Sequence, residues 1–168
     1  ESSYFIPDHN VMLARIKSIT QSRLSKQIII NKGLNDAVTL SDLVIGSDGV
    51  VGQVTEVTAL FATVKVLSDP TLHMPVKNSR TGVRGITKGL ASNEKGMVVE
   101  FIPLESDIKI GDIFVTSGIG NSYPSGYFVG RVKSVDESPN SLFMKVSIDP
   151  TQNMNQLELV LIVKEKNE

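Results

Sequence analysis

The sequence predicts an all-β protein made of two small six-stranded β-barrels in tandem. Short stretches of alternating apolar and polar residues, rich in valine and isoleucine, recur along the 168 residues and are separated by turn residues such as Asp48-Gly49. One strand pattern is also used twice. It runs from Val-Gly-Gln-Val at 51–54 to Asp69-Pro70, and again from Val-Gly-Arg-Val at 129–132 to Asp149-Pro150.

Twelve strands are expected, six for each barrel, and helix signals are scarce. Each strand is a β-branched or alternating run that stops at Gly, Pro, Asn, Asp or Ser, the residues that favour turns. We place the first barrel in residues 1–79 and the second in 80–168, and leave open the exchange of a terminal strand between them. The expected strands span residues 11–17, 27–31, 43–45, 50–57, 63–67, 73–77, 83–87, 97–102, 113–116, 127–135, 142–148 and 157–163.

The repeat places a glycine inside a strand in both copies. Gly52 and Gly130 are 78 positions apart, and the valines around them share that offset. A glycine weakens a strand unless it permits a bulge or a close backbone approach, so we assign both to barrel corners. Upstream, Asp42 matches Asp112 at an offset of 70, so 78 − 70 = 8 residues are inserted before the second hairpin, in the loop 117–126.

Composition excludes several classes of function. The net charge is −1 and the sequence pI is about 6.2, so the chain lacks the positive field that attracts nucleic acid. Cysteine is absent, which excludes disulfides and thiolate chemistry. The apolar runs are far shorter than the roughly 20 residues that span a bilayer. Because the chain begins Glu-Ser-Ser-Tyr, without Met or a signal pattern, we interpret it as part of a longer protein.

Two parts of the chain resemble the family of rod shape-determining proteins MreC. The more specific part is Gly-Asp-Ile-Phe-Val-Thr-Ser-Gly-Ile-Gly at 111–120, followed by Pro124, Gly126, the 129–132 motif and the final apolar run at 157–163. In the first half the similar residues are Lys32-Gly33, Gly-Val-Val-Gly-Gln-Val at 49–54, Leu-Ser-Asp-Pro at 67–70, Pro75-Val76 and Arg-Thr-Gly-Val-Arg-Gly at 80–85.

The resemblance implies a non-enzymatic scaffold of the bacterial cell-elongation machinery. Such a protein binds and activates the class B penicillin-binding transpeptidase of peptidoglycan synthesis and is linked to MreD, MreB and RodA. The resemblance also implies a location in the periplasm, or on the extracytoplasmic face of the cell membrane. A single N-terminal span that precedes residue 1 would be the anchor. No cofactor is implied.

Aromatic residues on loops are the first candidates for partner contacts. Tyr123, Pro124, Tyr127 and Phe128 lie in or just after the long loop, and Leu60-Phe61 occupies the corresponding turn of the first copy. Rigid rings on loops are favoured interface anchors. The alternative, that Phe61 and Phe128 close the ends of the barrels, carries equal weight. We expect one of Tyr127 and Phe128 to be the more exposed, because successive strand residues face opposite sides.

A local basic stretch gives a second candidate. Arg80 and Arg84 lie four apart, so in one extended strand they would form a stripe able to contact an acidic partner. A solvated barrel edge guarded by charge is the simpler interpretation. Exposed strand edges would also allow self-association by strand addition, giving a homodimer or filament.

Two alternative functions remain. Two six-stranded barrels also describe trypsin-like and chymotrypsin-like hydrolases, although only His9 and His73 could act as the base and no nucleophile motif is evident. An oligosaccharide- or nucleic-acid-binding barrel would place aromatic residues among basic ones, whereas here the two kinds lie in different segments. The spacing of Asp36, Asp42 and Asp48 does not fit a calcium loop, so no metal site is predicted.

Overall fold

The computed structural model describes residues 10–22, 25–90, 96–118 and 124–164. Twelve strands and one short 3-10 helix, η1 (Leu34–Asp36), are assigned within these ranges. No helix among the described residues is long and apolar enough to cross a membrane. The strands are β1 (Asn10–Gln21), β2 (Lys26–Ile30), β3 (Leu43–Ile45), β4 (Val50–Val57), β5 (Ala62–Val66), β6 (Pro75–Asn78), β7 (Arg84–Gly89), β8 (Met97–Pro103), β9 (Ile113–Thr116), β10 (Phe128–Glu137), β11 (Phe143–Pro150) and β12 (Leu159–Lys164).

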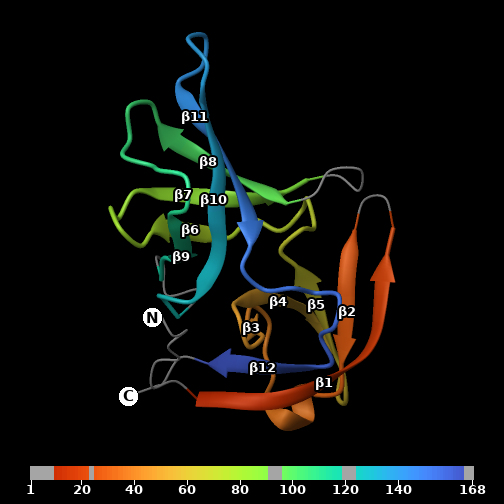
Figure 1. Ribbon diagram of the computed structural model, residues 1–168. Coiled ribbons are helices and arrows are strands. Elements are labelled where there is room, and N and C mark those ends of the chain that lie inside the picture. The colour runs from red at the N-terminus through yellow and green to blue at the C-terminus, as the bar shows by residue number, and fades with distance from the viewer. Residues whose placement is uncertain (1–9, 23–24, 91–95, 119–123, 165–168) are drawn as a thin grey trace.

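These strands form two closed, antiparallel barrels of six, which confirms the predicted fold class (Figure 1). The order around the first barrel is β1-β12-β3-β4-β5-β2, and around the second it is β10-β11-β8-β7-β6-β9. Closure gives every strand in these two sheets two neighbours, although the ends of the longest strands, such as residues 134–137 of β10, are paired on one side only. Self-association by strand addition stays a prediction, limited to these strand ends.

Each barrel contains one strand that comes, in the sequence, directly after a hairpin of the other barrel. β6 follows the β4–β5 hairpin of the first barrel but lies in the second, between β7 and β9. β12 follows the β10–β11 hairpin of the second barrel but closes the first, between β1 and β3. The expected barrels of residues 1–79 and 80–168 therefore exchange strands, which the sequence left open: residues 75–78 belong to the second barrel and 159–164 to the first.

The repeated motif produces the same local structure in both barrels. In the first barrel the Val54 amide donates to the Asp42 carbonyl at 2.9 Å, and in the second the Val132 amide donates to the Asp112 carbonyl at 2.8 Å. β3-β4-β5 and β9-β10-β11 are therefore equivalent three-stranded units.

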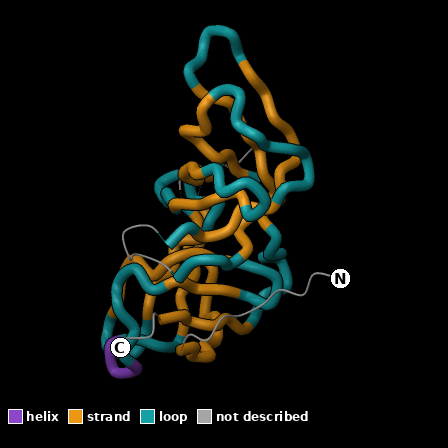
Figure 2. Tube along the Cα trace, turned by 90° about the vertical axis from the view of Figure 1, so that its left-hand side faces the viewer, coloured by secondary structure: helices purple, strands orange, loops and turns teal. Residues whose placement is uncertain are grey.

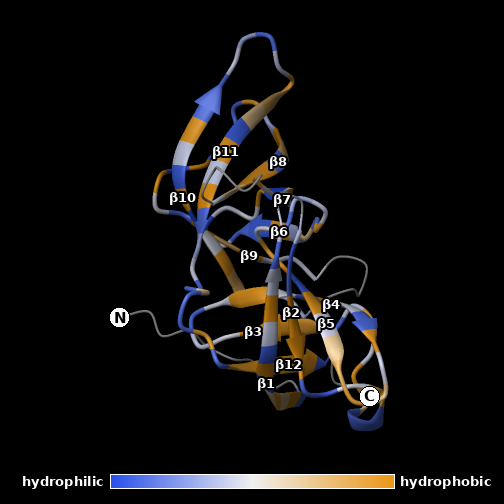
Figure 3. Ribbon diagram, turned by 90° about the vertical axis from the view of Figure 1, so that its right-hand side faces the viewer, coloured by the Kyte–Doolittle hydropathy of each residue, from blue (hydrophilic) through white to orange (hydrophobic). Residues whose placement is uncertain are grey.

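The apolar core consists of two buried clusters, one of which extends from the second barrel into the contact with the first. Inward-facing residues of the first barrel form one buried cluster. The other cluster combines the interior of the second barrel with Leu43, Ile45 and Val163, which alternate away from the first barrel's interior. Figure 3 shows this alternation as bands of hydropathy along the strands. The barrels are thus packed as one unit.

The molecule is elongated along the line that joins the barrels (Figures 1 and 2). η1 lies at one end, beneath the first barrel, and the long β10–β11 hairpin projects from the other. Surfaces at the two ends are therefore far apart.

Candidate interaction surfaces

The first candidate surface, the base patch, consists of Leu34, Leu60 and Phe61, three exposed apolar side chains beside η1. The β4–β5 turn is fixed because the Thr58 amide donates to the Phe61 carbonyl at 2.8 Å. The Leu34 amide in turn donates to the Thr58 carbonyl at 2.8 Å, which holds η1 against this turn. Leu60 and Phe61 point to solvent and are available for contact, as their prediction requires. Leu34 was missed because η1 is too short to give a helical pattern.

The described part of the long loop and the residues that follow it do not present the aromatic cluster expected there. Tyr127 is fully buried, and burial raises the pKa of its phenol to about 12. Pro124 is also buried, and its carbonyl accepts a 2.6 Å hydrogen bond from the Thr116 hydroxyl. These two residues stabilise the base of the loop and cannot dock a partner. Phe128 is half-buried, which agrees with the expected difference between neighbours, and Tyr123 lies outside the described residues.

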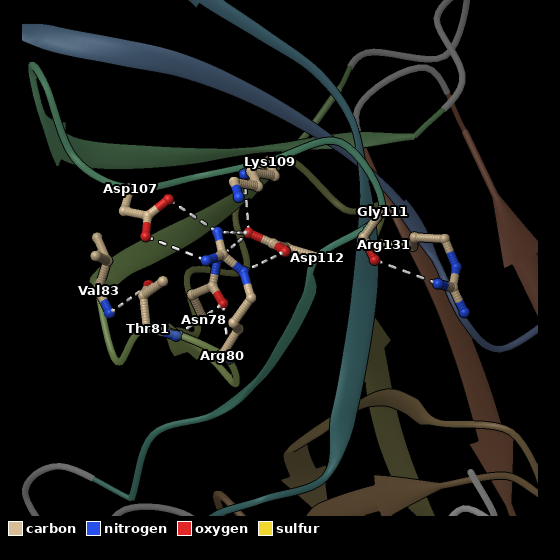
Figure 4. A network of polar contacts seen from close by, with 9 residues as sticks. All are labelled: Asn78, Arg80, Thr81, Val83, Asp107, Lys109, Gly111, Asp112 and Arg131. Atoms are coloured by element: carbon tan, nitrogen blue, oxygen red, sulfur yellow. Dashed lines mark hydrogen bonds and ion pairs between the residues drawn. The ribbon is translucent and has the colours of Figure 1, made fainter. Parts of the chain in front are cut away.

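Arg80 does not belong to an exposed basic stripe. It lies in the turn after β6, and its guanidinium forms ion pairs with Asp107 at 3.0 Å and Asp112 at 2.9 Å (Figure 4). The Asp112 carboxylate also accepts hydrogen bonds from Asn78 Nδ2 and the Lys109 amide, both at 2.8 Å. The hydrogen bond from Arg80, with those from Asn78 and Lys109, holds the pKa of Asp112 well below its usual range. Arg80 therefore stabilises the second barrel.

Arg84 is the exposed member of the predicted pair. It is the first residue of β7 and lies opposite Lys77 of β6 in the strand register. Two like charges directly opposite each other weaken a strand pair. This position is therefore suited to an acidic contact, which stays a prediction.

Replacing Asp112 with alanine is expected to destabilise the protein by about 2 kcal/mol, because buried Asn78 would lose its acceptor. Asp107→Ala is the matched control and should change little, since its side chain is 61% exposed against 8% for Asp112. Because the folded-state pKa of Asp112 is lowered, its stabilisation is complete above the unfolded pKa of about 4 and is lost at lower pH. Urea unfolding from pH 7 to pH 2 should therefore show the difference between wild type and Asp112→Ala shrinking on acidification.

A second apolar surface, the tip patch, lies at the far end of the second barrel. It comprises Phe101, Leu104, Leu142 and Phe143, of which Leu142 is 82% and Phe101 54% exposed. The rings of Phe101 and Phe143 pack edge to face with centroids 5.6 Å apart. A groove of about 310 Å³ runs beside them, and Figure 3 shows apolar segments on β8 in this region.

The tip patch was missed by sequence reasoning because strand alternation does not explain it. Phe101 has a φ of 67°, in the left-handed region that a bulky side chain rarely occupies. The register between β8 and β11 also shifts between Met144 and Val146. Non-glycine residues in such conformations are often found at functional positions.

The described residues give no support to catalytic or metal chemistry. They contain no group of three or more His, Asp or Glu side chains that could hold a metal ion. His73 Nδ1 lies 3.3 Å from the backbone carbonyl of Thr87, and His9 lies outside the described residues. A cleft of about 510 Å³ between the barrels is lined by polar side chains such as Gln21 and Asn155, and its described lining includes no aromatic ring.

The family model described as "Rod shape-determining protein MreC, barrel core" matches residues 16–164. The chain belongs to the MreC family. The cell shape-determining protein MreC of Escherichia coli is 31% identical over 156 residues, which cover 93% of this chain and 42% of that protein. The Listeria monocytogenes MreC is 29% identical over 166 residues, which cover 97% of this chain and 56% of that protein. The chain thus spans about half the length of the curated relatives it matches.

Solved MreC structures share the complete two-barrel arrangement. MreC from Pseudomonas aeruginosa superposes with a TM-score of 0.85 at 34% identity, covering 92% of this chain and 99% of that one. MreC from Listeria monocytogenes gives a TM-score of 0.87 at 29% identity, covering 99% and 81%.

Two more distantly related structures share the fold, and their descriptions name a cellular location and a binding partner. One, with a TM-score of 0.83 and 20% identity, covers 94% of this chain and 96% of that one, and is described as the major periplasmic domain of the cell shape-determining filament MreC. The other, with a TM-score of 0.70 and 16% identity, covers 93% and 100%, and is described as a complex between penicillin-binding protein PBP2 and MreC from Helicobacter pylori.

Proposed function

We propose that this chain is the extracytoplasmic part of a membrane-anchored, non-enzymatic scaffold of cell elongation. It binds and activates a class B penicillin-binding transpeptidase, self-associates, and acts together with MreD, MreB and RodA. Membership of the MreC family is the observation that carries the proposal. The Helicobacter pylori complex with PBP2 supports the choice of transpeptidase, and the periplasmic domain of the distant relative supports the location.

The base patch is the surface that we assign to the transpeptidase. Leu60 and Phe61 are exposed on a turn whose backbone is fixed by hydrogen bonds, so they are ordered before a partner binds. A preordered apolar anchor loses little conformational entropy on association. The contact would bury both side chains against an apolar pocket of the partner.

The Leu60→Asp/Phe61→Ser variant is expected to weaken transpeptidase binding at least about 100-fold, because two apolar anchors of about 1.5–3 kcal/mol each are removed. The measurement is biolayer interferometry with the extracytoplasmic part of the transpeptidase from the same organism. Ile110→Ser is the matched control, because Ile110 is 74% exposed and lies on the second barrel. Wild-type affinity in the double variant would exclude the base patch, and failure of the unaltered chain to bind would contradict the proposed function itself.

A further inference from the structure

One end of β1 has a neighbouring strand on one side only. The register of β1 with β12 ends at Arg15, and the last hydrogen bond between the two chains runs from the Ile16 amide to the Glu158 carbonyl at 2.9 Å. Beyond this point β1 continues in register with β2 alone. Residues 18–21 of β1 therefore present an open strand edge, for which the described part of the chain supplies no pairing strand.

The hydrogen-bond pattern of the β1–β2 hairpin shows which backbone groups lie on this open edge. The Ser22 amide donates to the Ser25 carbonyl at 2.8 Å, so these two residues form a hydrogen-bonded pair. Because such pairs alternate along antiparallel strands, Thr20 also bonds to β2, whereas Ile19 and Gln21 direct their backbone groups away from it. Two amides and two carbonyls are thus positioned to pair with a further strand.

A small apolar cavity, which we call the hairpin pocket, borders the open edge. Its volume is about 160 Å³. Ile19 and Ile28, which are opposite each other in the register, line it from the hairpin, and Met154 and Leu157 line it from the crossover between β11 and β12. Figure 1 shows this crossover, in blue, running down beside the β1–β2 hairpin. A peptide paired with the open edge would place the side chains of one of its faces at this pocket.

The hairpin pocket adjoins the cleft of about 510 Å³ between the barrels and shares Gln21, Lys26 and Asn155 with it. Lys26 is the one charged residue among the described residues that line either cavity, and it forms no ion pair with another described residue. Its backbone is held in place because its amide donates to the carboxylate of buried Asp69, which lines neither cavity, at 3.1 Å. The site therefore offers a carboxylate a positioned cation.

We propose that residues 18–21 of β1 accept an extended acidic segment of a partner protein as an additional strand. The backbone of the segment pairs with Ile19 and Gln21, which supplies affinity. One aliphatic side chain enters the hairpin pocket, and a carboxylate two residues away, on the same face of the segment, contacts Lys26. This site shares no residue with the base patch, and the proposal goes beyond the proposed function.

The probe for this site is the capped peptide Ser-Val-Thr-Asp-Ser-Thr, whose valine and aspartate lie on one face of an extended strand. The control peptide Ser-Val-Asp-Thr-Ser-Thr has the same composition but places them on opposite faces. In calorimetric titrations up to millimolar peptide, the probe should bind at least about fivefold more tightly than the control. Hydrogen exchange measured by NMR should show new protection at the amides of Ile19 and Gln21, while Thr20, already bonded to β2, stays unchanged.

Two variants of the chain test the strand edge and the cation. Ile19→Pro removes an amide on the open edge without removing a hydrogen bond to β2, and Lys26→Glu reverses the charge. Each should weaken binding of the probe at least about tenfold. Lys88→Glu is the matched charge control, because Lys88 is exposed on β7 and lines neither cavity. A probe with lysine in place of aspartate should bind Lys26→Glu more tightly than it binds wild type.

Three results would overturn the proposal: no binding of the probe to wild type at millimolar concentration, equal affinity for probe and control peptide, or wild-type affinity in both variants. Unfolding midpoints separate loss of the site from loss of folding. If Ile19→Pro lowers the midpoint, a probe N-methylated at the residues that face β1 gives the same reading on wild type and should fail to bind. None of these measurements involves the transpeptidase, so their outcome is distinct from that of the proposed function.

Discussion

Ending the chain after Gln156 is expected to abolish cooperative folding of the first barrel. This truncation removes β12, which lies between β1 and β3 and pairs with both. Val160, Ile162 and Val163 of β12 are almost completely buried. Each loses about 1.5–3 kcal/mol of apolar burial, and together this approaches the 5–15 kcal/mol that stabilises a typical domain. The second barrel keeps all six of its strands.

Hydrogen exchange measured by mass spectrometry provides the test. The amides of β1 and β3 should lose protection in the truncated chain, while those of β8 and β11 should keep more of theirs. A synthetic peptide of residues 157–168 should restore protection to β1 and β3. A chain that ends after Lys164 is the control and should behave as wild type. Wild-type protection of β1 in the truncated chain would contradict the assignment of β12 as the closing strand.

Gly52→Ala is expected to destabilise the protein by at least about 3 kcal/mol, beyond the range of most single substitutions. A Cβ at this position would overlap the carbonyl oxygen of Lys65 on the neighbouring strand β5. That oxygen belongs to the backbone of a closed barrel, so β4 and β5 would have to separate. The close approach, and not a positive φ, requires glycine here.

The equivalent change in the second barrel, Gly130→Ala, should cost less, about 1–2 kcal/mol. The nearest atom to its Cβ would be Ile148 Cδ1 at 2.7 Å, the far end of a flexible side chain, although the Asp149 carbonyl also lies at 2.9 Å. Guanidinium unfolding of both variants measures the two free energies. An equal effect at the two sites, or the reverse order, would show that the repeated glycines do not differ in the way the packing indicates.

Much of the fold could be predicted because it depends on local pattern. Alternation and turn residues located all twelve strands, and the repeated Val-Gly motif identified the equivalent hairpins. The exchange of β6 and β12 could not be predicted in the same way. Both strands have ordinary apolar runs, and their partners are chosen by how the barrels pack, which is a long-range property.

The candidate site residues also divide into those whose environment follows from local pattern and those whose environment depends on long-range contacts. The exposure of Leu60 and Phe61 could be predicted because a turn between two strands is exposed in almost any barrel. Arg80 was misassigned because its partners, Asp107 and Asp112, are about 30 positions away in the sequence. The tip patch was missed because it depends on an unusual backbone conformation at Phe101 and a register shift in β11.

The Asp-Pro-Thr sequence ends both repeats, but its aspartate has a different environment in each, which the sequence alone does not predict. Asp69 is fully buried, and its carboxylate accepts hydrogen bonds from Thr71 and from Ser25 and Lys26 at the start of β2. Asp149 is exposed and pairs with Lys133 at 3.5 Å, while the Thr151 hydroxyl is buried without a hydrogen-bond partner among the described residues.

The sequence by itself determined that each repeat ends at Asp-Pro-Thr, because proline lacks the amide that would continue a strand ladder. Only the tertiary structure decided that Asp69 lies in a turn after β5 that anchors β2, whereas Asp149 lies in β11, opposite Arg131 of β10. The physical reason is that the first turn packs against the β1–β2 hairpin, which supplies donors to a buried carboxylate, whereas Asp149 remains in solvent.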